Sequence, residues 1–336
     1  MKRINIVAWH NGGGLSRDVA IIFSALPENR FEVTLNGSPL ARAKVRRRRF
    51  AHRAANLRHL WFNRSQLESS PFDINLFLED ITPDFFKYAR VNAFIPNPEW
   101  FKKYQHRHLK GIDIVLCKTR HAQNIFETLG SRTRFISFTS EDRLSSTEVE
   151  QSQRDFLHLA GRSWQKGTKP LTELWLQHPE WPVLTVVQSA KTYSQSRVQS
   201  IDAPNIKHIL DRLDDTSMRA LQNAHAVHLC PSEAEGFGHC IAEAMSCRAL
   251  TLTTNAPPMN ELITKDRGIL VDYYKTRKQR SGENYYVDLA ELERSICTII
   301  AMDKVSIRHL GANARTWYEK NDQDFRKLFA GALEEL

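Results

Sequence analysis

The segment PSEAEGFGHCIAEAMSC, Pro231 to Cys247, decides the fold of this 336-residue chain. It follows the short apolar run AVHLC at 226–230, whose length and composition predict a buried parallel strand. Apolar residues then recur at helical spacing over 237–245, so we expect a strand, a tight glycine loop and a helix in that order. That succession is the building unit of an α/β domain with a parallel sheet.

The loop between this strand and helix is suited to a nucleotide sugar. Gly236 and Gly238 let the backbone approach a ligand closely, and the free N–H groups of the new helix favour an anionic group such as a diphosphate. Glu235 lies in the loop beside that group. Glu243 lies about one and a half turns into the helix, where its carboxylate can accept two hydrogen bonds from the vicinal hydroxyls of a ribose.

The same segment resembles the E-x7-E signature of retaining GT-B glycosyltransferases, the family-four-like group that includes bacterial transferases using UDP- or GDP-sugars. The resemblance extends from Glu235 and Glu243 to the flanking proline-serine, the EGFG loop, an EAM-like helix and the later run 260–262 (NEL). It implies an α/β fold of the GT-B type, with two Rossmann-like doubly wound domains facing each other across a cleft. An ordinary strand-to-helix turn with two solvated glutamates is the alternative.

This resemblance also implies a reaction and a set of roles. A sugar would move from a nucleotide diphosphate donor to a hydroxyl with retention of anomeric configuration, and the donor phosphate itself would take the acceptor's proton. Glu235 would hold the sugar hydroxyls and Glu243 the ribose, while the helix N-terminus at Phe237 and Gly238 would stabilise the leaving group. No metal and no separate cofactor are expected, because cations of the protein would neutralise the diphosphate.

The upstream segment FLHLAGRSWQKGT, Phe156 to Thr168, has the pattern of a strand, a loop and a helix start. By the resemblance, Arg162 and Lys166 of this loop neutralise the donor diphosphate, and fixed cations in a water-poor site stabilise developing charge strongly. The spacing between them is shorter than the usual one, which leaves the role of Lys166 open. Two solvated surface cations are the alternative.

A third glycine loop follows the first expected strand of the chain. Gly12, Gly13 and Gly14 precede a helical run at 17–26, but their pattern is not G-x-G-x-x-G and supports a dinucleotide fold poorly. Beside the other two motifs, this loop resembles the one through which the N-terminal domain reaches the donor phosphates.

Strand and helix patterns alternate along the whole chain. We expect an N-terminal Rossmann-like acceptor domain at 1–140, a polar linker at 141–154, a C-terminal nucleotide-sugar domain at 155–304 and helices at 305–336 that cross back to the first domain by resemblance. The expected strands are 4–8, 31–35, 74–78, 93–95, 114–117 and 135–138, then 157–160, 183–187, 206–209, 226–230, 249–253 and 268–271.

Composition excludes several classes of protein. The five cysteines are odd in number and contain no C-x-x-C pair, so neither a disulfide framework nor a zinc site is expected. The longest apolar runs, such as 183–187, are far shorter than the roughly 20 residues that a transmembrane helix needs. The N-terminal sequence lacks the hydrophobic region of a signal peptide, and we expect a cytoplasmic protein.

Charge is distributed unevenly between the two halves. Residues 1–150 hold 24 Lys and Arg against 15 Asp and Glu, whereas residues 151–336 hold 23 of each kind. Between Glu32 and Glu68 there is no acid but there are nine cations, and such a run favours a large polyanion. The nine are Arg42, Lys44, Arg46, Arg47, Arg48, Arg49, Arg53, Arg58 and Arg64. The acceptor is therefore expected on an anionic carrier, with Arg46, Arg47, Arg48 and Arg49 among its contacts.

Two carriers fit this basic run. An amphipathic helix from Arg49 to Trp61 would lie in the interface of an anionic membrane, as lipid-acceptor members of the family use their N-terminal domain. On DNA, arginines suit bidentate phosphate contacts and Trp61 could stack on a base or fill the gap of a flipped one. The apolar face is thin for a membrane anchor, which slightly favours DNA, as in virus-encoded enzymes that glycosylate hydroxymethylated pyrimidines.

Further acceptor candidates follow the expected strands of the N-terminal half. Asn97 and Glu99 lie in FIPNPEW, 94–100, and could bind sugar hydroxyls, unless the prolines simply brace a loop. Lys118 is a weaker candidate, and Glu79 or Asp80 could act as a general base. A nucleotide-sugar epimerase and an inactive binding protein remain rival functions. An epimerase would need no polyanion site, and an inactive binder would more plausibly have lost Arg162 or Glu235.

Overall fold

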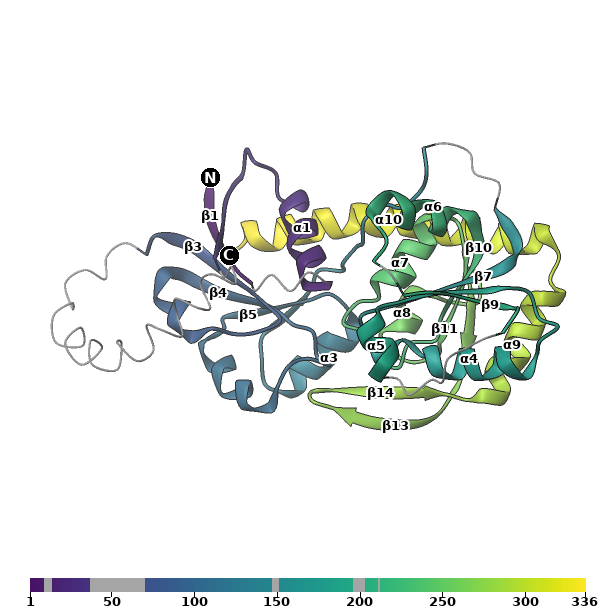
Figure 1. The fold of residues 1–336 in the computed structure, drawn as a ribbon. Helices are drawn as coiled ribbons and strands as arrows, with labels where there is room; N and C mark the ends of the chain where they lie inside the picture. Colours follow the sequence, from purple (N-terminus) through teal and green to yellow (C-terminus); the bar gives the residue numbers. More distant parts are fainter. Residues whose placement is uncertain (9–13, 37–69, 147–150, 196–202, 211) are drawn as a thin grey trace. The chain divides into compact units, whose positions relative to one another are not determined.

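The computed structural model describes residues 1–8, 14–36, 70–146, 151–195, 203–210 and 212–336 (Figure 1). The chain divides into two compact units, each of which contains one six-stranded sheet. The first comprises residues 1–118, 122–137 and 325–336, and the second comprises 119–121 and 138–324. The expected α/β fold with two parallel sheets is confirmed.

The first unit has a fully parallel sheet in the order β2-β1-β3-β4-β5-β6. Its strands are β1 Lys2–Val7, β2 Phe31–Asn36, β3 Phe72–Leu78, β4 Ala89–Ile95, β5 Ile114–Cys117 and β6 Thr133–Phe135. Its helices are α1 Gly14–Ala25 and most of α3 Arg120–Thr128, with the 3-10 helices η1 Pro83–Tyr88 and η2 Lys103–Gly111.

A ladder of asparagines crosses the middle of this sheet. Asn5, Asn75 and Asn92 occupy matching positions on β1, β3 and β4, and all three are buried. The Asn5 amide nitrogen donates to Asn75 Oδ1 at 2.7 Å, and the Asn75 amide nitrogen donates to Asn92 Oδ1 at 2.8 Å. A shift of one residue would leave these polar groups unpaired in the core, so the ladder fixes the register.

The second unit has a parallel sheet in the order β12-β11-β10-β7-β8-β9. Its strands are β7 Ser152–Gly161, β8 Leu184–Gln188, β9 Ile206–Ile209, β10 His225–Cys230, β11 Leu250–Thr254 and β12 Ile269–Val271. Its helices are η3 Trp164–Lys166, α4 Thr168–Gln177, α5 Ala190–Gln195, α6 Asp215–Ala224, α7 His239–Ser246, α8 Met259–Leu262, α9 Leu289–Ala301 and α10 Lys304–Glu334, whose last residues group with the first unit.

The two strand orders create a topological switch point in each sheet. In the second unit, β7 leads outward to β8 and β9 on one side, while β10, β11 and β12 follow on the other. Ligands of open α/β sheets bind at the carboxyl ends of the strands at such a point. The loops after β7 and β10, which carry the motifs singled out from the sequence, therefore meet where a ligand is expected.

One element of the second unit was not predicted. The antiparallel hairpin of β13 Tyr273–Gln279 and β14 Gly282–Val287 forms a separate two-stranded ribbon, drawn in yellow-green in Figure 1. All twelve expected strands are present, although β6 lies at 133–135 instead of 135–138 and β7 begins at Ser152, five residues early. The described part of the chain contains no helix long and apolar enough to cross a membrane.

Candidate functional site

The loops after β7 and β10 are joined by an ion pair. Lys166 Nζ lies 2.5 Å from Glu235 Oε1, and the side chains are only 18% and 9% exposed. Ser232 donates its hydroxyl to the same carboxylate oxygen at 2.7 Å. Because both partners are largely buried, each charge depends on the other for its stability in this position. The structure thus gives Lys166 a definite position beside Glu235, which its sequence spacing had left open.

The charge state of Lys166 follows from its surroundings. Burial alone would lower its pKa, but Cys240 and Glu235 beside it raise the pKa above the ordinary value for a lysine. Cys240 Sγ lies 3.5 Å from Lys166 Nζ. The lysine is therefore a fixed cation at the switch point throughout the physiological pH range. Arg162, on the same loop, is exposed.

Glycine is required where these loops touch. Gly167 has a φ of 72°, and a Cβ there would lie 2.1 Å from the carbonyl oxygen of Pro231. Gly238 has a φ of 112°, and a Cβ there would lie 2.8 Å from a methyl group of Leu262. The Glu233 amide nitrogen also donates to the Gln165 carbonyl at 2.8 Å. These close approaches hold the EGFG loop, the Lys166 loop and the start of α7 in one arrangement.

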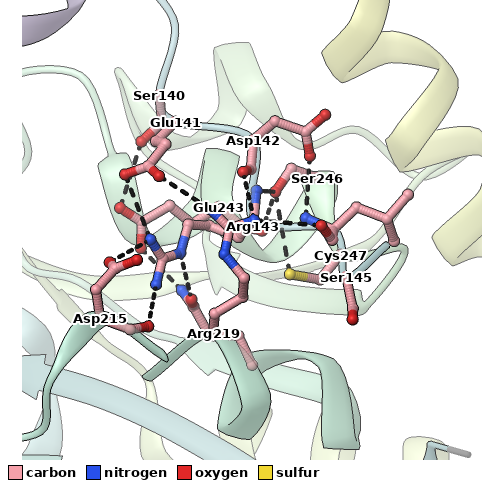
Figure 2. A network of polar contacts seen from close by, with 12 residues as sticks. Ser140, Glu141, Asp142, Arg143, Ser145, Asp215, Arg219, Glu243, Ser246 and Cys247 are labelled. Atoms are coloured by element: carbon pink, nitrogen blue, oxygen red, sulfur yellow. Dashed lines mark hydrogen bonds and ion pairs between the residues drawn. The ribbon is translucent and has the colours of Figure 1, made fainter. Parts of the chain in front are cut away.

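Glu243 lies on α7 inside a buried polar network (Figure 2). It is 4% exposed, its Oε2 accepts from Gln222 Nε2 at 2.9 Å, and the hydroxyl of Ser140 lies 3.4 Å from Oε1. Arg143 Nε donates to Gln222 Oε1 at 2.8 Å. Since the arginine can only donate, the Gln222 amide is turned so that its NH₂ group faces Glu243. The protein thereby orients this carboxylate and keeps hydrogen-bond donors directed at it.

Arg143 connects this network to the rest of the second unit. Figure 2 shows it beside Asp215, to which its guanidinium donates at 2.6 Å, and its own backbone nitrogen donates to Ser246 Oγ at 2.9 Å. Burial would lower the pKa of Arg143, but the hydrogen bond to Asp215 and the charge of Glu243 raise it. Arg143 lies within 141–154, the segment predicted as a linker, and the described residues 138–146 group with the second unit. No local sequence pattern marks these residues, because Ser140 and Arg143 lie in one segment and Gln222 lies 79 positions beyond Arg143.

A second carboxylate lies in the loop after β10. Burial raises the pKa of Glu233 to about 7, although a hydrogen bond from Asn284 opposes that rise. Asn284, on β14, donates to Glu233 Oε2 at 3.2 Å and accepts from Gln165 Nε2 at 2.8 Å. The hairpin therefore contacts both loops of the site through one buried side chain. No sequence pattern singles out Glu233 or Asn284.

Phe237 and Gly238 lie at the start of α7, as the sequence predicts. The Phe237 ring is buried and packs edge-on against Phe138 with ring centroids 5.4 Å apart. This side chain therefore belongs to the core, and only its backbone is left as a candidate for contact with a donor. Six predicted donor-side residues thus lie in the second unit: Arg162, Lys166, Glu235, Phe237, Gly238 and Glu243.

The acceptor candidates described in the first unit gather at the carboxyl edge of its sheet. Asn97 and Glu99 are buried in the loop after β4, and Asn97 Nδ2 donates to Glu79 Oε2 at 3.3 Å. Glu79 has a φ of 64° and its pKa is raised, chiefly by burial. Lys118 is buried in an ion pair with Asp18 at 3.0 Å. The cluster is consistent with hydroxyl binding, which stays a prediction.

Several predicted contacts lie outside the described residues. Gly12 and Gly13 belong to this group, whereas Gly14 is described as the first residue of α1. Arg46, Arg47, Arg48, Arg49 and Trp61 also lie outside the described residues.

Comparisons with known proteins bear on both the fold and the motifs. The family described as "Glycosyl transferases group 1" matches residues 145–283, which include Lys166, Glu235 and Glu243. Among solved structures, HepE of Anabaena in complex with UDP-glucose aligns over 100% of both chains at 16% identity with a TM-score of 0.70. The sucrose-phosphate synthase of Thermosynechococcus elongatus gives 15% identity, a TM-score of 0.70 and full coverage of both chains. The chain has the GT-B fold.

A further structure supports this assignment. A glycosyltransferase of Rickettsia africae aligns over 99% of this chain and 98% of its own, at 14% identity and a TM-score of 0.65. A search of curated protein sequences finds no match. The family match and the GT-B fold together support a glycosyltransferase.

Proposed function

We propose that this chain is a retaining glycosyltransferase that moves a sugar from a UDP- or GDP-sugar to a hydroxyl on an acceptor carried by a polyanion. The observation that carries the proposal is the Lys166–Glu235 pair, buried at the switch point of the second sheet and next to the start of α7. A permanent cation, a carboxylate and the N-terminus of α7 at one sheet edge suit a diphosphate joined to a polyhydroxyl group.

A uridine nucleotide is the preferred donor. Solved structures of the Anabaena neighbour contain UDP, UDP with glucose, and UDP-glucose. In this chain Glu243 would bind the ribose, since Gln222 and Ser140 hold it in one orientation and a carboxylate keeps further lone pairs for hydroxyl donors. Glu235 would accept hydrogen bonds from the sugar.

The chemistry needs one bond exchange. The bond between the anomeric carbon and the diphosphate oxygen breaks, and the acceptor oxygen bonds to the same carbon on the same face. The acceptor proton passes to the departing phosphate oxygen, and the nucleoside diphosphate leaves with its bonding electron pair. Lys166 and the exposed Arg162 would neutralise the charge that develops on this leaving group.

The acceptor proposal rests on the basic run at 42–64. We prefer phage-type DNA with hydroxymethylated pyrimidines, because the run is rich in arginine and has a thin apolar face. A lipid or lipopolysaccharide acceptor at an anionic membrane is the alternative.

Mass spectrometry of the products tests the proposal. The full chain is incubated with mixed UDP- and GDP-sugars and duplex DNA containing 5-hydroxymethylcytosine, with an anionic lipid extract in parallel. A sugar-sized mass on the nucleoside supports the DNA acceptor, and a mass shift only among the lipids replaces it with the alternative. Conversion of one nucleotide sugar into another indicates an epimerase, and release of no nucleotide contradicts the transferase itself.

A further inference from the structure

The outer strand of the β13–β14 ribbon is exposed along almost its whole length. Its sequence is YYKTRKQ, and every side chain from Tyr273 to Lys278 is exposed. Tyr273 and Tyr274 are 40% and 66% exposed, which is unusual for aromatic side chains. A strand with both faces open to solvent contributes little to a core, so its composition has another cause.

That composition is cationic and aromatic. Lys275, Arg277 and Lys278 lie within four residues, and the strand contains no acid. Glu283 is the one acidic residue of the two strands; it is exposed and pairs in register with Lys278. Asp272, just before the strand, is engaged by the Asn255 amide at 2.7 Å. Positive charge is thus concentrated on a surface of a half-chain whose net charge is zero.

The ribbon is fixed rigidly to the donor site. The Tyr285 amide nitrogen donates to the Glu233 carbonyl at 2.7 Å, and Asn284 bonds to both Gln165 and Glu233. Gln165 precedes Lys166 directly, and Glu233 lies two residues before Glu235. A partner bound on the outer strand is therefore held beside the loops that carry the proposed chemistry.

From these observations we infer that the β13–β14 ribbon binds the phosphate backbone of duplex nucleic acid, with Lys275, Arg277 and Lys278 on phosphates and the exposed tyrosines against bases or sugars. A two-stranded ribbon fits the major groove, which is about 12 Å wide. A membrane is less suitable, because binding to lipid scales with buried apolar area and this strand has no aliphatic side chain. The role of the ribbon in presenting an acceptor rests on the proposed function, whereas the binding itself does not.

Binding of labelled duplex DNA to the full chain tests the inference. The variant combines Lys275→Gln, Arg277→Gln and Lys278→Gln. Its matched control combines Lys304→Gln, Arg308→Gln and Lys320→Gln, which removes the same charges from exposed positions of α10. Fluorescence anisotropy gives the dissociation constant at several salt concentrations.

Three lost phosphate contacts reduce the slope of log affinity against log salt by about 2.7, so that the loss of affinity between 50 and 200 mM salt becomes about 40-fold smaller. The α10 control is expected to keep the affinity and slope of the wild type. Equal affinity and slope in the ribbon variant overturn the inference, as does binding of the wild type to phosphatidylglycerol vesicles or an anionic polysaccharide without binding to duplex DNA.

Release of UDP from UDP-sugars, measured in the same variants, separates this inference from the proposed function. Loss of DNA binding with unchanged nucleotide release supports the ribbon as a separate surface. DNA binding by a wild type that releases no nucleotide from any donor would leave the ribbon's binding in place and contradict the transferase.

Discussion

The segment 231–247, which contains the EGFG loop and α7, lies in the same unit as the ribbon at 273–287 and contacts it, yet only this segment is apparent from the sequence. The loop carries its chemistry in a compact pattern of glycines and glutamates at fixed spacing. The ribbon carries its chemistry in ordinary cations, which neighbouring acids balance when charge is summed over the half-chain. A binding site built from one segment can be recognised by its sequence motif. A charged binding surface can be recognised only when the fold shows which charges are exposed.

The two regions should respond differently to substitution. Changes in the loops around Glu235 remove charge stabilisation and should affect turnover. Changes in the ribbon should affect stability and partner binding.

Replacement of Lys166 should have the largest effect. Lys166→Met removes the buried cation and leaves Glu235 without its ion-pair partner, so we expect a loss of about 10²–10³ in kcat, comparable to the loss of one oxyanion-hole donor. Steady-state kinetics of nucleotide release measures it. The double variant Lys166→Met with Glu235→Gln removes the unpaired charge and serves as the folding control; near-normal turnover in the single variant would refute the role of Lys166.

Replacement of Arg162 should have a smaller effect on turnover and none on the fold. Arg162→Ala removes an exposed cation from the loop after β7, and we expect kcat to fall about 10²-fold while the melting temperature is unchanged. The exposed Lys169, on the following helix, provides a control through Lys169→Ala. A rate within a factor of two of the wild type would contradict a phosphate contact by Arg162.

Gln222 should determine donor affinity. Gln222→Met removes the donor that orients Glu243, and one hydrogen bond to a charged group corresponds to about tenfold weaker binding of UDP with little change in kcat. Isothermal titration calorimetry measures the affinity. The adjacent buried Asn223 contacts the Arg143 carbonyl but has no described contact with Glu243, so Asn223→Ala should lower stability and leave UDP affinity intact. An equal loss in both variants would indicate a purely structural role for Gln222.

Replacement of Asn284 should lower the stability of the protein, because this side chain links the ribbon to the loops of the site. Asn284→Ala leaves the buried Gln165 amide without its acceptor, which costs about 1–3 kcal/mol in the free energy of unfolding. Urea denaturation measures it, with Asn313→Ala as the control, because the Asn313 hydrogen bond is exposed and should contribute less. A change in Asn284→Ala no larger than in the control would mean that the ribbon is not held through this residue.

The smallest effect concerns pH. Because the pKa of Glu233 is about 7 in the folded protein and 4.5 ordinarily, the folded state binds more protons between these values. The contribution of Glu233 to stability is therefore fully present below pH 4.5 and is lost as the pH rises to about 7. The melting temperature of the wild type minus that of Glu233→Gln should decrease from pH 5 to pH 7.5. A constant difference would contradict the raised pKa.

Much of the fold is predictable because it depends on local patterns. Buried parallel strands are short apolar runs between glycine or polar loops, and all twelve were found this way. The ribbon was missed because YYKTRKQ is polar at nearly every position and shows no alternation. The start of β7 was missed because its first residues, at 152–155, are polar.

The site is predictable only in part, for a similar reason. Glu235 and Gly238 belong to a segment whose spacing indicates a role, whereas the spacing around Lys166 leaves its role open. The orientation of Glu243 depends on Ser140 and Arg143, which are close in sequence, and on Gln222, which lies 79 positions beyond Arg143 and is brought to them only by the fold. Pairing between distant polar side chains leaves no local periodicity to detect.

Binding of free nucleotides tests the donor site by itself, since it needs neither the acceptor nor the donor sugar. Calorimetric titration of the wild type and Lys166→Met with UDP and with GDP measures whether the second unit holds a nucleoside diphosphate. We expect the wild type to bind one of the two, with UDP preferred, and Lys166→Met to bind it at least tenfold more weakly. Binding of neither nucleotide, or equal affinity in the variant, would contradict a donor site at the Lys166–Glu235 pair.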